Sequence, residues 1–201
     1  MRSLLAPTLF LLPALPATAA DLSLIVDRSE RGVEIFVKLP TDRTEALLAP
    51  FPEGFVDADG LINIEPFRAG TFRQGDVLWS KVETVIGEET ALVEAMSMMV
   101  HPDELPVDFN DPIDGWIAMA VCNVTEENAR YDPEVLSTYA GFFAWEVDGH
   151  GPVHITFPQD MEIEVTEFLE GREIASLTIQ TGPDDPLALD AVTTWERIRF
   201  W

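Results

Sequence analysis

Sulfur and imidazole side chains that could bind copper lie close together in one segment of the sequence. The segment holds Met96, Met98, Met99 and His101, and thioether and imidazole groups both suit copper ions. On a strand, Met99 and His101 would share one face, and the other two methionines would point to the opposite face. The pattern therefore predicts a copper site at Met99 and His101 or, in the simpler interpretation, methionines that fill a hydrophobic core.

Carboxylates in two loops could hold calcium. Asp57 and Asp59 precede Gly60 as in the middle of an EF-hand loop. The first ligand position of such a loop, which is normally acidic, holds Phe55 instead, so an ordinary Asp-Gly turn is the alternative. A second oxygen-rich group has no recognised spacing and consists of Asp108, Asn110, Asp111 and Asp114.

Two histidines flank a turn and could form a zinc site. His150 and His154, with Asp148 or Glu146, supply the imidazole and carboxylate ligands that zinc uses. Side-chain alternation places His154 on the polar face of its strand, whereas His150 lies in the turn. Solvated surface histidines are therefore the alternative interpretation.

No familiar catalytic motif occurs in the sequence. It contains no G-x-S-x-G nucleophile elbow, no H-E-x-x-H zinc motif and no P-loop. The single cysteine, Cys122, ends an apolar run without a histidine beside it, so we expect a small core residue rather than a nucleophile. Acidic residues are so abundant that a glycosidase-like carboxylate pair stays open, but no spacing selects one. We therefore expect binding rather than catalysis, without a resident cofactor.

Charge and the first residues limit the functional classes. The chain has 36 acidic and 12 basic residues and a net charge of −24 at pH 7, which repels nucleic acids and anionic lipid surfaces. Residues 1–20 resemble a signal peptide, because Arg2 precedes an apolar run that ends at small residues before Asp21. We expect a periplasmic or secreted protein whose mature part, residues 21–201, is a single domain without a membrane span.

The stretch from residue 141 to 181 shows the clearest structural pattern. Apolar and polar residues alternate through four segments, which predicts four antiparallel strands that share one apolar face. A short glycine-containing loop between the last two segments would set Val165 opposite Leu177 and Ile163 opposite Ile179.

The remaining elements are predicted from periodicity and turn residues. Residues 22–26 and 33–39 should form a hairpin with its apolar residues on one face. The other expected elements, in chain order, are a short helix at 42–48, strands at 60–67 and 76–86, a strand rather than a helix at 90–101, a loop at 102–115, a central strand at 116–124 and a short helix after Pro133.

Two of these strands are also expected to pair with each other. A short turn between residues 76–86 and 90–101 would close a hairpin. Its register would pair Ile86 with Leu92, Val82 with Met96 and Leu78 with Val100. Short strands at hairpin spacing, together with 15 prolines, predict a mainly β fold: an antiparallel β-sandwich or open barrel with one or two short helices.

The residues after about 187 form a predicted tail, 187–201, with an unusual composition. Large apolar side chains alternate there with a local concentration of positive charge, in Trp195, Arg197, Ile198, Arg199, Phe200 and Trp201. Interfaces favour aromatic and arginine side chains. We therefore predict that the protein binds a protein partner, or a second copy of itself, through this tail, a sheet face or an edge strand. The alternative is a metal-binding protein, with copper at Met99 and His101 or calcium at the aspartate loops.

Overall fold

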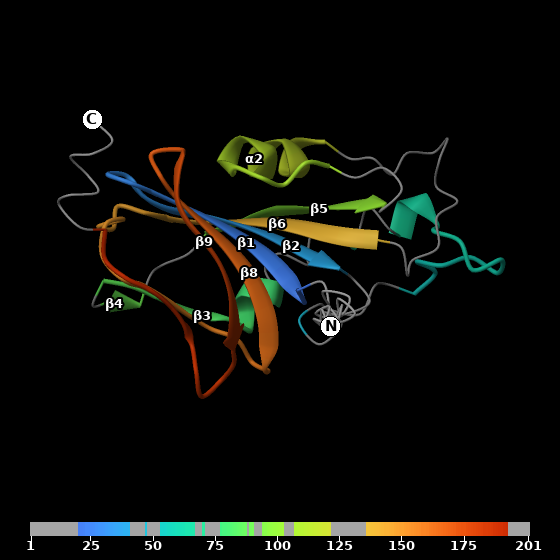
Figure 1. Ribbon diagram of the computed structural model, residues 1–201. Coiled ribbons are helices and arrows are strands. Elements are labelled where there is room, and N and C mark those ends of the chain that lie inside the picture. Colours follow the sequence, from blue (N-terminus) through green and yellow to red (C-terminus); the bar gives the residue numbers. More distant parts are fainter. Residues whose placement is uncertain are drawn as a thin grey trace, which may run out of the picture.

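Two β-sheets pack face to face, and one helix covers part of the outer face of the larger sheet (Figure 1). The computed structural model describes residues 20–40, 47, 53–66, 70, 77–87, 89–90, 94–102, 107–121 and 136–192. The elements are β1 (Leu22–Ser29), β2 (Gly32–Pro40), β3 (Glu83–Ile86), β4 (Glu89–Thr90), β5 (Glu94–Pro102), α2 (Pro112–Ala120), β6 (Leu136–Trp145), β7 (Val153–Thr156), β8 (Met161–Leu169), β9 (Arg172–Thr181) and β10 (Leu187–Leu189). The predicted mainly β fold is confirmed.

The larger sheet has six strands in the order β5-β6-β2-β1-β8-β9, and the smaller has four in the order β10-β7-β3-β4. All neighbours are antiparallel except β1 and β8, which run parallel in the middle of the larger sheet. A parallel pair needs a long connection. Here the chain between β1 and β8 includes strands of the smaller sheet, of which β7 comes directly before β8. The chain therefore crosses between the two layers before it returns.

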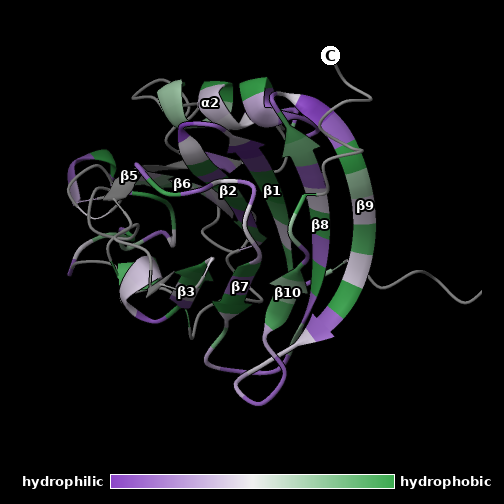
Figure 2. Cartoon of the chain, turned by 90° about the vertical axis from the view of Figure 1, so that its left-hand side faces the viewer, coloured by the Kyte–Doolittle hydropathy of each residue, from purple (hydrophilic) through white to green (hydrophobic). Residues whose placement is uncertain are grey.

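Two predicted hairpins are confirmed, the second of them with its predicted register. In β1 and β2, Val26 lies opposite Ile35 and Leu24 opposite Val37. In β8 and β9, the partners of Val165 and Ile163 are the predicted Leu177 and Ile179. Alternation along β9 is visible as green bands separated by pale bands, with purple near the ends of the strand (Figure 2).

The prediction that residues 141–181 form one continuous four-stranded meander is wrong. Strand β6 pairs with β2 and β5, and β7 lies in the other sheet, between β3 and β10. Only β8 and β9 of the four are neighbours. Alternation assigns a side chain to a face of a strand, but it does not decide which strand lies alongside, because several strands carry the same pattern.

The main core fills the space between the sheets. It takes the inward-facing residues of β1, β2 and β8, among them Val26, Ile35 and Ile163, and those of β7, such as Ile155. Each of these side chains is at most 2% exposed. A second, smaller core lies on the opposite face of the larger sheet, beneath α2: Ile25, Phe36, Ala118, Met119, Tyr139, Phe143 and Phe168.

Two strands predicted in the first half of the chain are wrong. Of the predicted strand 60–67, only an isolated bridge between Val56 and Ile62 exists, and residues 64–66 turn helically. Of the predicted strand 76–86, residues 77–80 are helical, and only β3 is extended. Leu78 and Val82 are buried in both readings, because a spacing of four places residues on one face of a helix as well as of a strand.

Of the predicted strand 90–101, residues 94–101 are extended in β5 and residues 91–93 lie outside the described residues, but the predicted hairpin register is wrong. Strand β5 pairs with β6, not with β3, and Val100 lies opposite Thr138 rather than Leu78. The short turn predicted after β3 instead joins β3 to the two-residue strand β4, where Ile86 pairs with Glu89.

The largest correction concerns residues 102–124. A proline-rich loop followed by a central strand was expected, but residues 112–120 form the helix α2. The apolar run that suggested a strand covered on both faces is an amphipathic helix with one face on the sheet. Several expected features lie outside the described residues: the leader at 1–19, the helix at 42–48 apart from Leu47, Cys122, the helix after Pro133 and the tail from 193 onward. The tail region begins with strand β10. None of the described helices has the length and apolar character needed to cross a membrane.

Candidate functional site

Helix α2 begins where its sequence provides a cap. The Asp111 carboxylate accepts a hydrogen bond from the Asp114 N–H at 2.9 Å, and Pro112 occupies the first turn. Proline suits this position because its missing N–H would have no partner inside the helix. Asp114 in turn accepts hydrogen bonds from the backbone and side chain of Asn110. The carboxylates of the predicted calcium cluster at 108–114 therefore include two that hold the start of α2.

The inner face of α2 fits closely on the larger sheet. Pro112, Gly115, Ala118 and Met119 are its buried residues. A Cβ atom at Gly115 would collide with the ring of Phe36, so glycine is what allows the helix to approach β2. The backbone of α2 at Gly115 therefore lies directly against the Phe36 ring.

Five large apolar side chains on and beside α2 are exposed to solvent. Their exposed fractions are 69% for Ile113, 38% for Trp116, 47% for Ile117, 44% for Val121 and 48% for Trp145. In the described part of the chain they are five of the six large hydrophobic side chains that are exposed, the sixth being Val56. We call these five residues the α2 patch. Such clustering distinguishes the patch from the singly exposed apolar residues that are common on protein surfaces.

Aromatic stacking joins the helix part of the patch to the strand part. The ring of Trp116 stacks on that of Phe143, with centroids 5.0 Å apart, and Phe143 lies 5.6 Å from the ring of Trp145. Phe143 itself is buried. The two tryptophans are therefore fixed on either side of one buried ring, and the patch is a continuous surface.

Acidic groups surround the patch. The indole N–H of Trp116 donates to the Glu34 carboxylate at 3.2 Å. Asp27 lies opposite Glu34 in the β1–β2 register. Burial raises the pKa of Asp27 to about 6, the hydrogen bond from the Gly171 N–H opposes this rise, and the charges of Glu34 and Glu170 add to it. At neutral pH the rim is negative, and one of its members changes charge within the physiological range.

A polar groove of about 450 Å³ runs beside the patch on the same face of the sheet. Its floor includes Ser23, Glu164 and Thr166, and residues 107–110 form one wall. Two of its carboxylates, Glu164 and Glu173, are separated by four rungs of the β8–β9 ladder, because Glu173 lies opposite Phe168. Four residues of a strand span about 13 Å, which is more than the carboxyl separation that glycoside hydrolysis uses. The pair Glu164 and Glu173 therefore does not have the spacing of a glycosidase carboxylate pair.

Of the predicted copper ligands, the structure describes the side chain of His101. It is 1% exposed, and its Nε2–H donates to the Ala118 carbonyl at 2.8 Å. Burial lowers the pKa of His101, and the hydrogen bond to Ala118 opposes that shift. This histidine therefore joins β5 to α2 in its neutral form, and Nδ1 is the ring nitrogen without a hydrogen-bond partner among the described residues. Met99 pairs with Tyr139 through its backbone in β5.

The predicted calcium ligand Asp57 stabilises a turn. Its Oδ1 accepts hydrogen bonds from the N–H groups of Asp59 and Leu61 at 2.9 and 3.0 Å. This is the Asp-Gly turn of the alternative interpretation. No group of three or more potential ligands from His, Cys, Asp and Glu is placed to hold a metal ion within the described ranges. The metal sites stay predictions.

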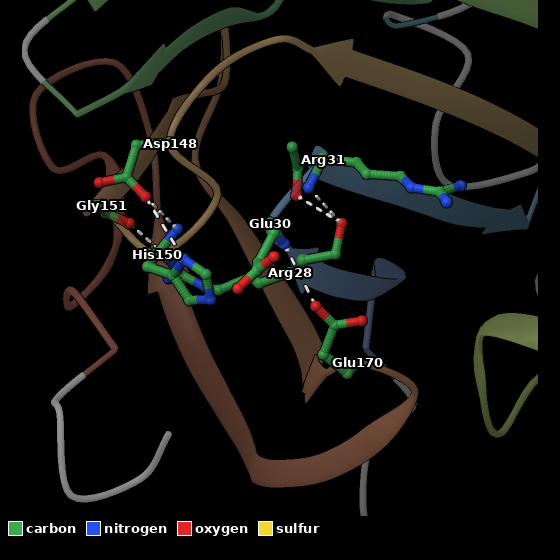
Figure 3. Close-up of polar contacts among 9 residues, drawn as sticks. Arg28, Glu30, Arg31, Asp148, His150, Gly151 and Glu170 are labelled. Atoms are coloured by element: carbon green, nitrogen blue, oxygen red, sulfur yellow. Dashed lines mark hydrogen bonds and ion pairs between the residues drawn. The ribbon is translucent and has the colours of Figure 1, made fainter. Parts of the chain in front are cut away.

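The two histidines of the predicted zinc site differ in their surroundings. His150 is 8% exposed and lies 3.4 Å from an oxygen of Asp148 (Figure 3). His154 lies in β7, where it pairs with Val85 and Ala188 in its neighbouring strands. The loop that holds His150 is organised by backbone contacts, since the Gly149 Cα position lies against the carbonyls of Ser29 and Gly32.

A buried ion pair, which the sequence reasoning missed, fixes this same end of the sandwich. Arg28 is fully buried and contacts Glu167 through two nitrogens, at 3.0 and 2.8 Å. Its other donors reach the carbonyls of Gly151 and Asp190 (Figure 3 shows the former). The signal was available: Arg28 continues the inward alternation of Leu22, Leu24 and Val26, and a charge at an inward position requires a partner.

The predicted partner-binding residues, Trp195, Arg197, Ile198, Arg199, Phe200 and Trp201, lie outside the described residues. The α2 patch is a candidate binding surface that was not predicted from the sequence and that the structure reveals. Its signal was the start of the apolar run at residues 116–124, which was assigned to a strand. Comparison with known proteins finds no family model that matches the chain and no similar sequence among curated proteins.

Proposed function

We propose that this chain is a non-catalytic binding module that engages a protein partner through the α2 patch. The observation that carries the proposal is the concentration of exposed apolar side chains on one helix and the adjoining strand end. Two of the five are tryptophans, the residue type most enriched among side chains that dominate binding energy. A surface of this composition is stabilised when a partner removes it from water.

The patch is rigid, which supports a role in recognition. Its helix is capped at Asp111, held against Phe36 through Gly115 and tied to β5 by the hydrogen bond between His101 and Ala118. A surface that is ordered before binding loses little conformational entropy when the partner arrives. The α2 patch therefore has the properties of a preformed binding surface.

The rim defines the chemistry of the partner. Asp114 lies in the first turn of α2, Glu34 contacts Trp116, and Glu146 follows Trp145. Arg31, whose carbonyl accepts a hydrogen bond from the Glu146 N–H, adds a positive charge in this neighbourhood. The balance is negative, so the partner segment that fits best is apolar or aromatic at its centre and basic at its edges. We further propose, from the predicted leader at residues 1–20, that the partner is met outside the cytoplasm.

Site-specific photo-crosslinking tests the proposal. A photoreactive amino acid at Ile117 should give a discrete cross-linked product with another protein in the native host, whereas the same group at the exposed Thr178 of β9 should not. The identified partner, once purified, should bind the I113D/I117D variant at least tenfold more weakly than the unchanged chain. Equal products at both positions, or unchanged affinity of the variant, would refute the patch as the contact. A cross-linked product with the mass of two copies of this chain would show that the patch mediates self-association instead of binding a different protein.

A further inference from the structure

We propose that the polar groove beside the α2 patch binds a short peptide of two or three residues through the charges at its two free ends. The inference goes beyond the proposed function, because the groove is a separate surface of the larger sheet and takes a small ligand rather than a protein. The charges, hydroxyl groups and apolar wall of the groove are arranged to fit a ligand of this kind.

Charges of both signs line the groove without neutralising each other. They are the ammonium group of Lys38 and the carboxylates of Asp108, Glu164 and Glu173. Within the described part of the chain, none of these four side chains takes part in an ion pair. The Lys38 ammonium instead lies over the ring of Tyr139 in β6, 5.8 Å from its centroid. A ligand that carries both a carboxylate and an ammonium group would therefore find an unpaired charge of opposite sign for each.

The sheet holds Lys38 and Glu164 at the spacing of a short peptide. Ser23 lies opposite Lys38 in the β1–β2 ladder and opposite Glu164 in the β1–β8 ladder, so the three residues form one row across three strands. Ile25 and Phe36, two residues along from Ser23 and Lys38, pack beneath α2, which places the row on the outer face. Strands two places apart are separated by about 10 Å, and two or three extended residues span about 7–10 Å. A peptide lying across the strands can thus place its carboxylate at Lys38 and its ammonium group at Glu164.

Hydroxyl groups and an apolar wall suit the body of such a peptide. Beside the row, Thr166 and Ser176 lie opposite each other in the β8–β9 ladder and line the groove. Their hydroxyl groups can donate to a peptide carbonyl or accept from a peptide N–H. Val107 and Phe109 line the wall, and the Phe109 ring is held edge-to-face against Tyr139, with centroids 5.6 Å apart. The volume of about 450 Å³ lies within the range of small-molecule pockets, about 300–1000 Å³.

The remaining carboxylates predict which peptides bind most tightly. Once Lys38 and Glu164 have met the two ends of the peptide, Asp108 and Glu173 leave the groove negative. A basic side chain on the peptide would be attracted, and an acidic one would be repelled. We therefore expect the tripeptide Ala-Lys-Ala to bind more tightly than Ala-Glu-Ala.

Calorimetric titration of the full chain with tripeptides tests the inference. Ala-Lys-Ala with both ends free should bind with a dissociation constant in the millimolar range or below. Its N-acetylated form and its C-amidated form should each bind about fivefold more weakly, because each loses one solvent-accessible ion pair. Absence of binding, or equal binding of the free and blocked peptides, would overturn the inference.

Two variants assign the ends of the peptide. Lys38→Met should weaken binding of the free peptide about fivefold and should remove the difference between the free and the C-amidated peptide. Glu164→Gln should act in the same way on the difference between the free and the N-acetylated peptide. Lys81→Met and Glu83→Gln remove the same charges outside the groove and should bind like the unchanged chain. Groove variants that bind no differently from these controls would place the peptide elsewhere and overturn the inference.

The I113S/I117S variant separates this inference from the proposed function. It should keep its affinity for Ala-Lys-Ala, because neither residue lines the groove. Loss of tripeptide binding in this variant would place the peptide on the α2 patch and overturn the groove as its site. Cross-linking from Ile117 to a protein partner is measured without the tripeptide, so the proposed function stands or fails independently of the groove.

Discussion

The two faces of the six-stranded sheet are built from the same strands but are closed in different ways. The inner face is covered by the four-stranded sheet along β1, β2, β6 and β8, and most of its apolar side chains are within a few per cent of complete burial. The outer face is covered by α2 over part of its area, beside an open polar groove, and the helix presents apolar residues to water. The inner face thus supplies stability, and the outer face supplies surface for recognition.

Charged residues follow the same division. On the inner side, Arg28 and Glu167 neutralise each other at the end of the core, where four hydrogen bonds satisfy the guanidinium group. On the outer side, Asp27 and Glu34 are like charges on neighbouring strands. A paired buried charge is costly to disturb, whereas a repelling pair near the surface costs stability when both members are ionised.

The largest effect is expected from removing one member of the buried pair. Glu167→Ala leaves the Arg28 guanidinium buried without its counter-charge and should lower the free energy of unfolding by about 3–5 kcal/mol. Glu164→Ala, three residues earlier on the outer side of β8, should change it by less than about 0.5 kcal/mol. Urea denaturation measures both. Similar losses for the two variants would show that the faces do not differ in this way.

A smaller loss is expected where α2 meets the sheet. Gly115→Ala places a Cβ atom against the Phe36 ring and pushes the helix outward. Overpacking of this kind costs about 1–3 kcal/mol, whereas alanine in place of glycine favours a helix by about 1 kcal/mol. A net loss of about 1 kcal/mol should appear in thermal unfolding, with Ile117→Ala on the outer side of α2 as the control. A stabilised Gly115→Ala variant would contradict the close approach of helix and strand.

Replacing Asp27 should change the stability about as much as Gly115→Ala does, but as a gain rather than a loss and only at higher pH. Its folded pKa of about 6 lies above the ordinary value of 3.8, so the contribution of Asp27 to stability is present at low pH and is lost as the pH rises through 6. Asp27→Asn should therefore stabilise the protein at pH 8, by about 1 kcal/mol after allowance for solvent screening. The difference should vanish near pH 4. Denaturation curves of both chains at the two pH values test this, and a destabilised variant at pH 8 would contradict the buried, repelled carboxylate.

The smallest effect on stability is expected at the α2 patch itself. The I113S/I117S variant should change the free energy of unfolding by no more than about 0.5 kcal/mol, because both side chains are 47% exposed or more. The same variant should bind less of a hydrophobic fluorescent dye than the unchanged chain. A large loss of stability would instead show that these residues contribute to the core. It would contradict the conclusion that the outer face of α2 adds little to stability.

Prediction from sequence succeeded where a local pattern determines the structure. Val165 and Leu177 face each other because a short loop with Gly171 in the left-handed region, at φ 73°, fixes the register of β8 and β9. It failed where an apolar run suited two structures. Residues 116–124 were predicted to form a buried strand, although Asp111 and Pro112 shortly before them are an N-cap and a first-turn proline. The capping signal was present, but the hydrophobicity of the run was given more weight.

The sequence by itself determined the β-rich character of the chain, the inward and outward faces of β1, β2, β8 and β9 and the register of the β8–β9 hairpin, because alternation and turn geometry act over a few residues. Only the tertiary structure decided that β1 and β8 lie side by side, that Arg28 meets Glu167 and that α2 exposes an apolar face next to Trp145. These contacts join residues far apart in the chain, and many strands carry interchangeable patterns. Their choice depends on the packing of the whole molecule.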